Sequence, residues 1–255
     1  MSLAEGEKMK NYLLFRLYGP LASWGDIAVG THRPSYDHPS KSAVMGFLAA
    51  AIGIRRNEEN KHRELAEAYN FAVLVNSPGV FLRDYHTAQI PSARSLKKQN
   101  HIVTRKEELG VEKQELTAVL SSRDYYSDFL YTIAIWPKEE YSETIPYSLE
   151  LFEKKLNEPE FVLYLGRKSC PLALPVEAKI VSCNGLKEAF DKAEFKCEPL
   201  LGLVKKPKQA RLYWEGEENG LMPIHTVMRR DLTLSRKRWQ FADRKEHYMM
   251  LDLRE

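Results

Sequence analysis

The sequence predicts an α+β fold of the ferredoxin-like (RRM-like) type that carries a protruding hairpin. Strand and helix patterns alternate as β-α-β…β-α-β over the first 165 residues, which is the order of a split βαβ unit. Residues 82–122 break this pattern, since their apolar period is weak and they have no clear core face. The 255 residues, 44% of them apolar, are enough for one large domain or two small ones.

The first elements are a buried strand and a closely packed helix. Residues 12–18 are an apolar run of strand length that Gly19 and Pro20 stop. A Gly- and Pro-rich loop follows, and Ser40 or Ser42 is a suitable N-cap for a helix that runs to about Ile52. Small residues dominate this helix, so we expect it to pack closely on a sheet.

The next elements lead into the hairpin. Residues 57–69 carry many charges and predict an exposed helix, and 71–75 predict a second strand that ends in the turn-forming residues 76–79. About 40 residues without a core face are rarely a plain loop. We therefore expect 82–122 to form a projecting hairpin or functional arm.

Later elements complete the split unit. Residues 129–136 are β-branched and aromatic, and Pro137 stops this strand. An amphipathic helix follows at 145–156, and a short strand at 161–165 runs into a Gly-containing turn. Weaker strands are expected at 178–182, 210–214 and 224–228, and basic and apolar residues alternate from 222 to 249.

These elements divide the chain into two expected parts. Residues 9–165 form the ferredoxin-like domain, including the hairpin at about 83–122. Residues 166–255 begin with a Gly-rich turn and continue as a small β-rich part or a second, reduced ferredoxin-like unit. No linker-like segment separates the two parts.

The charge distribution points to an RNA partner more than the net charge of +3 does. Residues 83–106 hold six basic residues and one acidic residue, interleaved with Tyr, His, Gln, Asn and Ser. Phosphates need Lys or Arg, and unpaired bases need planar side chains on which to stack. Residues 229–238 form a second basic cluster, followed by Trp239 and Phe241. A solvated charged surface is the alternative interpretation of both segments.

Several classes of function find no support in the sequence. The three cysteines lack the paired spacing of a zinc site, and their sparse, odd count fits a reducing cytoplasm. No apolar stretch is long enough for a membrane span. There is no P-loop and no G-x-G-x-x-G, so we expect no metal, no cofactor and no small-molecule substrate.

One catalytic arrangement stays open. A metal-independent ribonuclease needs a base for the 2′-hydroxyl, an acid and a cation, and His86, Tyr85 and Lys97 can fill these roles. A histidine on a loop is more often a hydrogen-bonding or base-contacting residue. We therefore expect no enzyme, and keep a metal-independent endoribonuclease as the alternative.

Five segments in register resemble a known family. They are 17–25 (LYGPLASWG), Arg33-Pro34, 38–54 (HPSKSAVMGFLAAAIGI), 83–87 (RDYHT) and 164–172 (YLGRKSCPL). Together they resemble the CasD-type subunits of type I-E CRISPR Cascade complexes, which are part of the RAMP superfamily. The sequence departs from the family at Lys41, where Arg is usual, and Lys loses the bidentate phosphate geometry of Arg.

The resemblance implies a RAMP domain with a thumb hairpin and a cytoplasmic role in antiviral defence. Such a subunit binds the 5′ handle of the CRISPR RNA, caps the filament of backbone subunits, contacts the large subunit and meets target DNA only indirectly. The resemblance also specifies the enzyme alternative, a metal-independent endoribonuclease that processes CRISPR precursor RNA. A protein scaffold whose basic segments pair with acidic partners is a further alternative. The residues expected to contact RNA are Arg33, Ser40, Lys41, Ser42, Tyr85, His86, Arg94, Lys97, Lys98, His101, Arg105, Arg167, Lys168, Ser169, Arg236 and Arg238.

Overall fold

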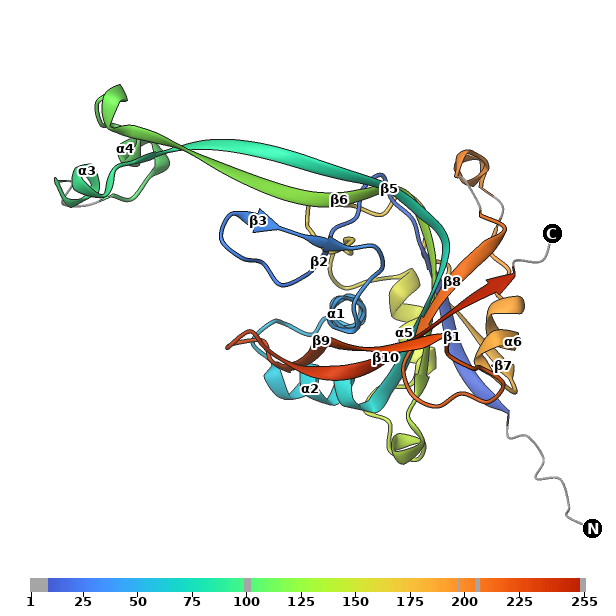
Figure 1. Ribbon diagram of the computed structural model, residues 1–255. Helices are drawn as coiled ribbons and strands as arrows, with labels where there is room; N and C mark the ends of the chain where they lie inside the picture. Colours follow the sequence, from blue (N-terminus) through green and yellow to red (C-terminus); the bar gives the residue numbers. More distant parts are fainter. Residues whose placement is uncertain (1–8, 99–101, 197, 205–206, 253–255) are drawn as a thin grey trace, which may run out of the picture.

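The computed structural model describes residues 9–98, 102–196, 198–204 and 207–252 (Figure 1). Within these residues one sheet follows the path β7-β1-β6-β5-β8-β10-β9, and β3 pairs with β6 beside this path. Its strands are β1 (Lys10–Leu17), β3 (His32–Arg33), β5 (Tyr69–Pro91), β6 (Leu116–Pro137), β7 (Lys179–Cys183), β8 (Gln209–Trp214), β9 (His225–Ser235) and β10 (Gln240–Asp252). A small separate sheet pairs β2 (Trp24–Gly25) with β4 (Ser35–Tyr36).

Helices lie on both sides of the main sheet, and Figure 1 shows α1 and α2 on one side and α6 on the other. The helices are α1 (Lys41–Ala51), α2 (Glu59–Ala68), α3 (Ala93–Lys98), α4 (Arg105–Glu108), α5 (Leu149–Asn157) and α6 (Leu186–Asp191), with 3-10 turns η1 (Lys113–Glu115), η2 (Glu139–Tyr141) and η3 (Pro199–Leu203). No helix in the described segments is long and apolar enough to span a membrane.

β1 is buried on both faces, which explains why its sequence is a continuous apolar run. Leu13 and Phe15 face the core formed with α1, α2 and α5. Tyr12 and Leu14 alternate with them and face the core formed with α6. The predictions of this strand and of the helix that Ser40 caps are confirmed, since the Ser40 side chain accepts a hydrogen bond from the Ala43 N–H at 3.2 Å.

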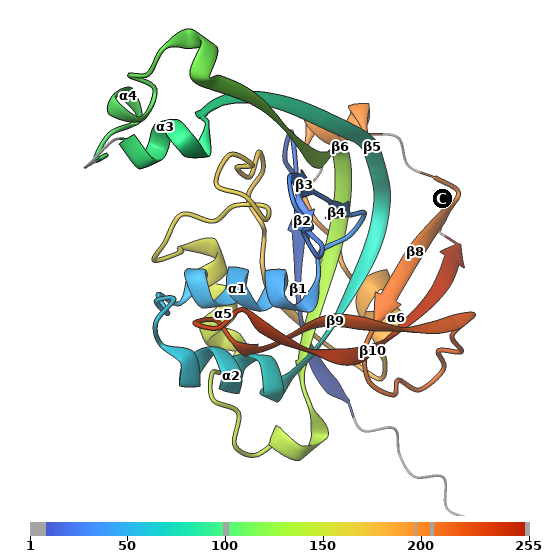
Figure 2. The same cartoon turned by 60° about the vertical axis from the view of Figure 1, so that its left-hand side comes forward.

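The expected projecting arm at 82–122 is the outer part of a hairpin built by β5 and β6 (Figures 1 and 2). The prediction that β5 ends at 76–79 is wrong. The strand passes through these residues with a register shift between Val75 and Ser77, and Gly79 has a φ of 70°. Pro78 lies beside this irregularity, where a strand tolerates the loss of an N–H donor.

The expected strand at 161–165 is also wrong. Leu163 and Leu165 are buried in alternation, but their segment forms only an isolated bridge between Tyr164 and Pro171. Its backbone bonds go to loops instead, since the Leu165 N–H donates to the Cys170 carbonyl and the Ser23 N–H donates to the Leu165 carbonyl. The alternating burial of Leu163 and Leu165 therefore arises without pairing of this segment to another strand.

The C-terminal strands extend the same sheet. β7 pairs with β1 at one end, and β8 pairs with β5 at the other, where β10 and β9 continue the sheet. The expected boundary at 165/166 falls in the loop before β7, so strands from both expected parts lie side by side. Cys170 and Cys183 are buried free thiols whose pKa values are raised by burial, and Cys197 lies outside the described residues.

Candidate nucleic-acid interface

The outer hairpin, 80–91 paired with 116–127, projects from the sheet and carries α3 and α4 at its far end (Figures 1 and 2). It passes over the β2–β4 region, and most of its side chains contact solvent rather than core. Tyr85 is 62% exposed and Leu120 is 56% exposed. A long ladder with so little core of its own leaves its side chains free to contact a ligand.

Tyr85 and His86 are both exposed on β5 but point to opposite faces of the hairpin, because successive residues of a strand alternate. Tyr85 lies opposite Ser122 and His86 lies opposite Ser121. The His86 ring pairs with Asp84 on its own face, and Lys97 lies on α3 at the far end of the hairpin. The strand therefore does not bring the imidazole and the phenol of the catalytic alternative together.

A polar cluster holds the base of the hairpin against the loop before α1. The Arg83 guanidinium donates to both carboxylate oxygens of buried Asp124, at 2.7 and 3.1 Å, and this hydrogen bonding raises the pKa of Arg83. The His32 ring lies 2.7 Å from the Ser122 hydroxyl and 3.5 Å from Asp124. Arg33 pairs in register with Arg123, and its guanidinium donates to the Gly30 carbonyl at 2.6 Å.

At the far end of the hairpin, Arg94 and Lys97 are exposed on α3. Arg105 starts α4, pairs with Glu108 at 2.5 Å and also donates to the Gln89 carbonyl. The Thr104 capping box fixes this short helix. The side chain of Lys98 and the whole of His101 lie outside the described residues.

The start of α1 differs from expectation. Ser40 caps the helix, and its hydroxyl lies 3.1 Å from that of Ser42. Lys41 is only 1% exposed, and its ammonium donates to the Tyr69 carbonyl at 2.9 Å and to Glu215. Burial lowers the pKa of Lys41, while Glu215 opposes that shift. The expected contact of Lys41 with a phosphate is therefore replaced by a buried ion pair. The partner in this pair, Glu215, directly follows β8 in the chain.

The turn at Gly166 packs against the loop that precedes α1. Gly166 has a φ of 84°, and a Cβ at this position would lie 1.9 Å from the Ser23 carbonyl oxygen. The glycine is therefore required by the close approach of the loop before α1. Lys168 and Ser169 are exposed on this turn, whereas Arg167 lies over the Tyr125 ring at 5.1 Å.

The second basic cluster is divided by the alternation of β9. Arg229 is buried and donates to Glu246 at 3.0 Å, while Arg230 on the other face is exposed. Arg244 of β10 bridges Asp231, at 2.6 Å, and Glu246. Burial alone would raise the pKa of Glu246, but His38, Arg229 and Arg244 lower it below its usual range. Part of the expected RNA-binding charge is thus neutralised inside the protein.

The turn between β9 and β10 borders an open groove of about 1330 Å³. Arg236 lines the groove and donates to the Ser42 carbonyl at 2.9 Å, while Arg238 is exposed on the same turn. Sequence reasoning missed the contribution of Arg56, whose guanidinium lies 4.6 Å from the centre of the Trp239 ring. No local pattern joins these two residues, which are brought together only by the fold.

Comparison with known proteins identifies the family. Residues 12–246 match the family described as "CRISPR-associated protein (Cas_Cas5)". The chain belongs to the Cas5 family of CRISPR-associated proteins. It is 32% identical over 178 residues to the "CRISPR system Cascade subunit CasD" of Escherichia coli (strain K12), covering 66% of this chain and 70% of the relative. The predicted resemblance to CasD-type subunits is confirmed.

Solved structures share the fold of this Cas5 chain. A chain of a "CRISPR RNA-guided surveillance complex" aligns with a TM-score of 0.61 at 22% identity, covering 95% of this chain and 90% of that chain. A second structure, "Crystal structure of Cas protein", aligns with a TM-score of 0.57 at 24% identity, covering 94% and 95%. These likenesses support the mixed helix and strand architecture over nearly the whole chain.

Proposed function

We propose that this Cas5-family chain is a non-catalytic subunit of a type I-E CRISPR Cascade complex and holds the 5′ handle of the CRISPR RNA. Similarity to E. coli CasD supports the role as a Cascade subunit. In the proposed complex the chain caps the filament of backbone subunits and contacts the large subunit. It meets target DNA only through the assembled complex.

We also propose a ferredoxin-like RAMP assignment for the fold. The antiparallel order β7-β1-β6-β5, with α1 and α2 between β1 and β5 and with α5 between β6 and β7, supports it. The division into 9–165 and 166–255 stays a prediction. A division of the sheet by pairing would place β7 with the first unit, because β7 pairs with β1.

The observation that carries the RNA-binding proposal is the projecting hairpin. It is exposed over its outer length, and it presents Tyr85, His86, Arg94 and Lys97 away from the core. Phosphates and unpaired bases of single-stranded RNA require cations and planar groups of this kind. The proposed contacts are Arg33, Ser42, Tyr85, His86, Arg94, Lys97, Lys98, His101, Arg105, Arg167, Lys168, Ser169, Arg236 and Arg238.

Two expected contacts take an indirect role in this proposal. Ser40 caps α1 and Lys41 pairs with buried Glu215, so both fix the helix start rather than touch a phosphate. Their replacement is expected to lower stability more than RNA affinity.

The proposal is tested by incubating the full chain with labelled CRISPR repeat RNA in EDTA. A cleavage gel and a binding shift are run on the same samples. Uncut RNA that shifts, with preference for the handle sequence, is the expected result. No preference for the handle, even with backbone subunits present, would refute it.

Cleavage at one site in the repeat would instead establish the endoribonuclease alternative. The His86 ring is oriented by Asp84, which is the feature that favours it, but Tyr85 points to the other face of the hairpin. Loss of cleavage in His86→Ala would then locate the base.

A further inference from the structure

We infer that Arg56 and Arg236 form a seat for one RNA phosphodiester, beside a base-stacking platform at Trp239. This inference rests on the proposed function, because it names a specific RNA contact at the β9–β10 turn. The seat lies where the groove beside α1 meets a second pocket of about 980 Å³, and both cavities are lined by Arg56 and Arg236.

Arg236 is a largely buried cation without an acidic partner. Its Nη2 donates to the Ser42 carbonyl at 2.9 Å, but its buried Nε has no hydrogen-bond partner. Among the described residues, no carboxylate lies within ion-pair distance of its guanidinium. Burial and the positive charge of Arg56 both lower the pKa of Arg236. A desolvated cation in this setting is stabilised by any anion that can reach it.

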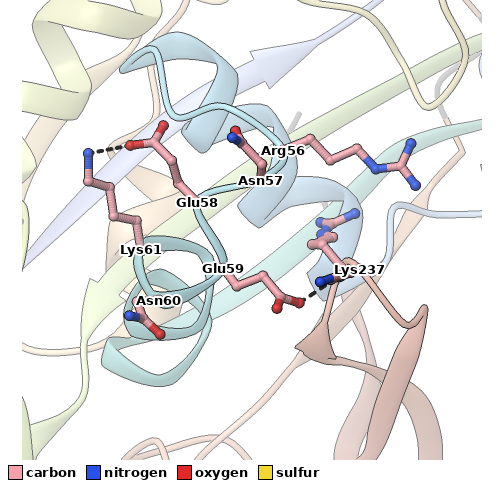
Figure 3. Close-up of a pocket in the computed structure, with 8 residues that line it drawn as sticks. Arg56, Asn57, Glu58, Glu59, Asn60, Lys61 and Lys237 are labelled. Atoms are coloured by element: carbon pink, nitrogen blue, oxygen red, sulfur yellow. Dashed lines mark hydrogen bonds and ion pairs between the residues drawn. The ribbon is translucent and has the colours of Figure 1, made fainter.

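The acidic residues of the adjacent pocket have other partners. Glu58 accepts from Lys61 Nζ at 2.6 Å and from the Arg55 N–H at 2.6 Å. Glu59 accepts from the Ser235 hydroxyl at 2.5 Å and from the Lys237 N–H at 3.0 Å. Figure 3 shows Glu58 pointing toward Lys61 and Arg56 extending in a different direction. The two glutamates of this pocket therefore form no ion pair with either arginine.

α1 leaves room for this arrangement. A Cβ at Gly46 would lie 3.2 Å from Arg236 Nη2, so a larger residue would require the guanidinium to shift by a few tenths of an ångström. This position of α1 therefore faces the β9–β10 turn. The small side chains of Ala43 and Ala50 also line the groove.

Trp239 supplies the flat surface that an unpaired base needs. Its indole is 57% exposed, lies under the Arg56 guanidinium and stacks with Phe241 at a centroid distance of 6.2 Å. Two guanidinium groups can hold a phosphate by several hydrogen bonds, and a neighbouring aromatic ring can stack on a base. This combination fits a nucleotide better than an acidic peptide, which has no base to stack.

Fluorescence anisotropy tests the seat with the full chain and labelled single-stranded repeat RNA over a range of KCl concentrations. Arg56→Gln and Arg236→Gln are each expected to weaken binding and to reduce the slope of log K against log salt by about 0.7, the value for one phosphate on a single strand. Because both arginines hold the same phosphate, the double variant is expected to show nearly the same slope as either single variant.

Lys61→Gln is the matched control, since Lys61 lines the same pocket but pairs with Glu58. It is expected to leave the slope unchanged. Trp239→Leu is expected to remove the part of the RNA-induced fluorescence quenching that comes from stacking. Arg56 is exposed, so Arg56→Gln keeps the test valid if Arg236→Gln fails to fold.

The outcomes separate this inference from the proposed function. If the unmodified chain shows no RNA binding, the proposed function fails. If the chain binds RNA and both single variants keep its affinity and slope, the seat is refuted and the arginines belong to another contact, such as an acidic protein surface. Complete displacement of RNA by millimolar inorganic phosphate at constant ionic strength would assign the seat to free phosphate and also refute the inference.

Discussion

Residues 83–106 and 229–238 are both dense in Arg and Lys, yet the two segments lie in different surroundings. In the first, Arg94 and Lys97 extend into solvent at the end of a hairpin. In the second, Arg229 is buried against Glu246, and only the outward-facing positions of β9 and its turn remain open. Local charge density therefore predicts a nucleic-acid surface only where no distant carboxylate neutralises it.

The largest expected effect is a loss of stability when the buried ion-pair network is disrupted. Arg244→Met leaves Asp231 and Glu246 buried without one of their cations. Removing one partner of a buried ion pair costs about 3–5 kcal/mol. Urea denaturation should show a loss of stability of this size, whereas Arg94→Met on the hairpin should leave the midpoint unchanged. A destabilisation in Arg244→Met no larger than in Arg94→Met would contradict this role of the buried network.

The second effect concerns the turn at Gly166. Gly166→Ala combines a φ of 84° with a Cβ that would lie 1.9 Å from the Ser23 carbonyl oxygen. We expect a destabilisation of about 2 kcal/mol or more, measured by thermal unfolding. Gly25→Ala is the control, because a Cβ there meets nothing within 4 Å. Equal stability of the two variants would mean that the turn is not fixed by its own backbone contacts.

The third effect is the pH dependence of stability. The folded-state pKa of Glu246 is lowered because His38, Arg229 and Arg244 outweigh the opposing effect of burial. A lowered pKa stabilises the fold at pH values above the ordinary Glu pKa of about 4.3, and this stabilisation is lost as the pH falls below it. Each pKa unit corresponds to about 1.4 kcal/mol.

Denaturation at pH 7 and pH 3 should therefore show a loss of stability that is smaller in Glu246→Gln than in the unmodified chain. The same loss in both would rule out Glu246 as a source of the pH dependence.

The smallest effect on stability, and the clearest on binding, comes from the exposed segment. Arg94→Gln with Lys97→Gln should lower RNA affinity and reduce the salt slope by about 0.7 for each phosphate that the variant no longer binds. Thermal unfolding of this variant should match the unmodified chain.

Lys41→Met is expected to lower the stability of the fold and to leave the salt slope of RNA binding unchanged, because the Lys41 ammonium pairs with buried Glu215. A reduced slope in Lys41→Met would restore Lys41 as an RNA-binding residue.

The sequence predicted those features that depend on local pattern. The strand before Gly19, the helix that Ser40 caps and the long hairpin are all visible as runs, caps and breaks in period. The strand expected at 161–165 failed because alternating burial of Leu163 and Leu165 does not require a β-partner. The expected strand end at Pro78 and Gly79 failed because a strand irregularity uses the same residues as a turn.

The candidate site was less predictable, because its chemistry depends on residues far apart in the chain. Lys41 and Glu215 are 174 positions apart, and nothing local to Lys41 indicates that a carboxylate will bury it. Arg56 follows α1, and Trp239 lies in the turn between β9 and β10. Their stacking therefore depends on how the β9–β10 turn packs beside α1. The exposure of hairpin residues such as Tyr85 could be predicted, because it follows from the weak apolar pattern of their own segment.

The central claim is that the outer hairpin and the β9–β10 turn form the RNA-binding face. Ultraviolet crosslinking of the full chain to repeat RNA, followed by mass spectrometry of the peptides, tests it most directly. We predict crosslinks within 80–98, within 116–123 and at 236–241, with none on β7 or α6. Crosslinks concentrated on β7 and α6, with the hairpin unmodified, would contradict this claim.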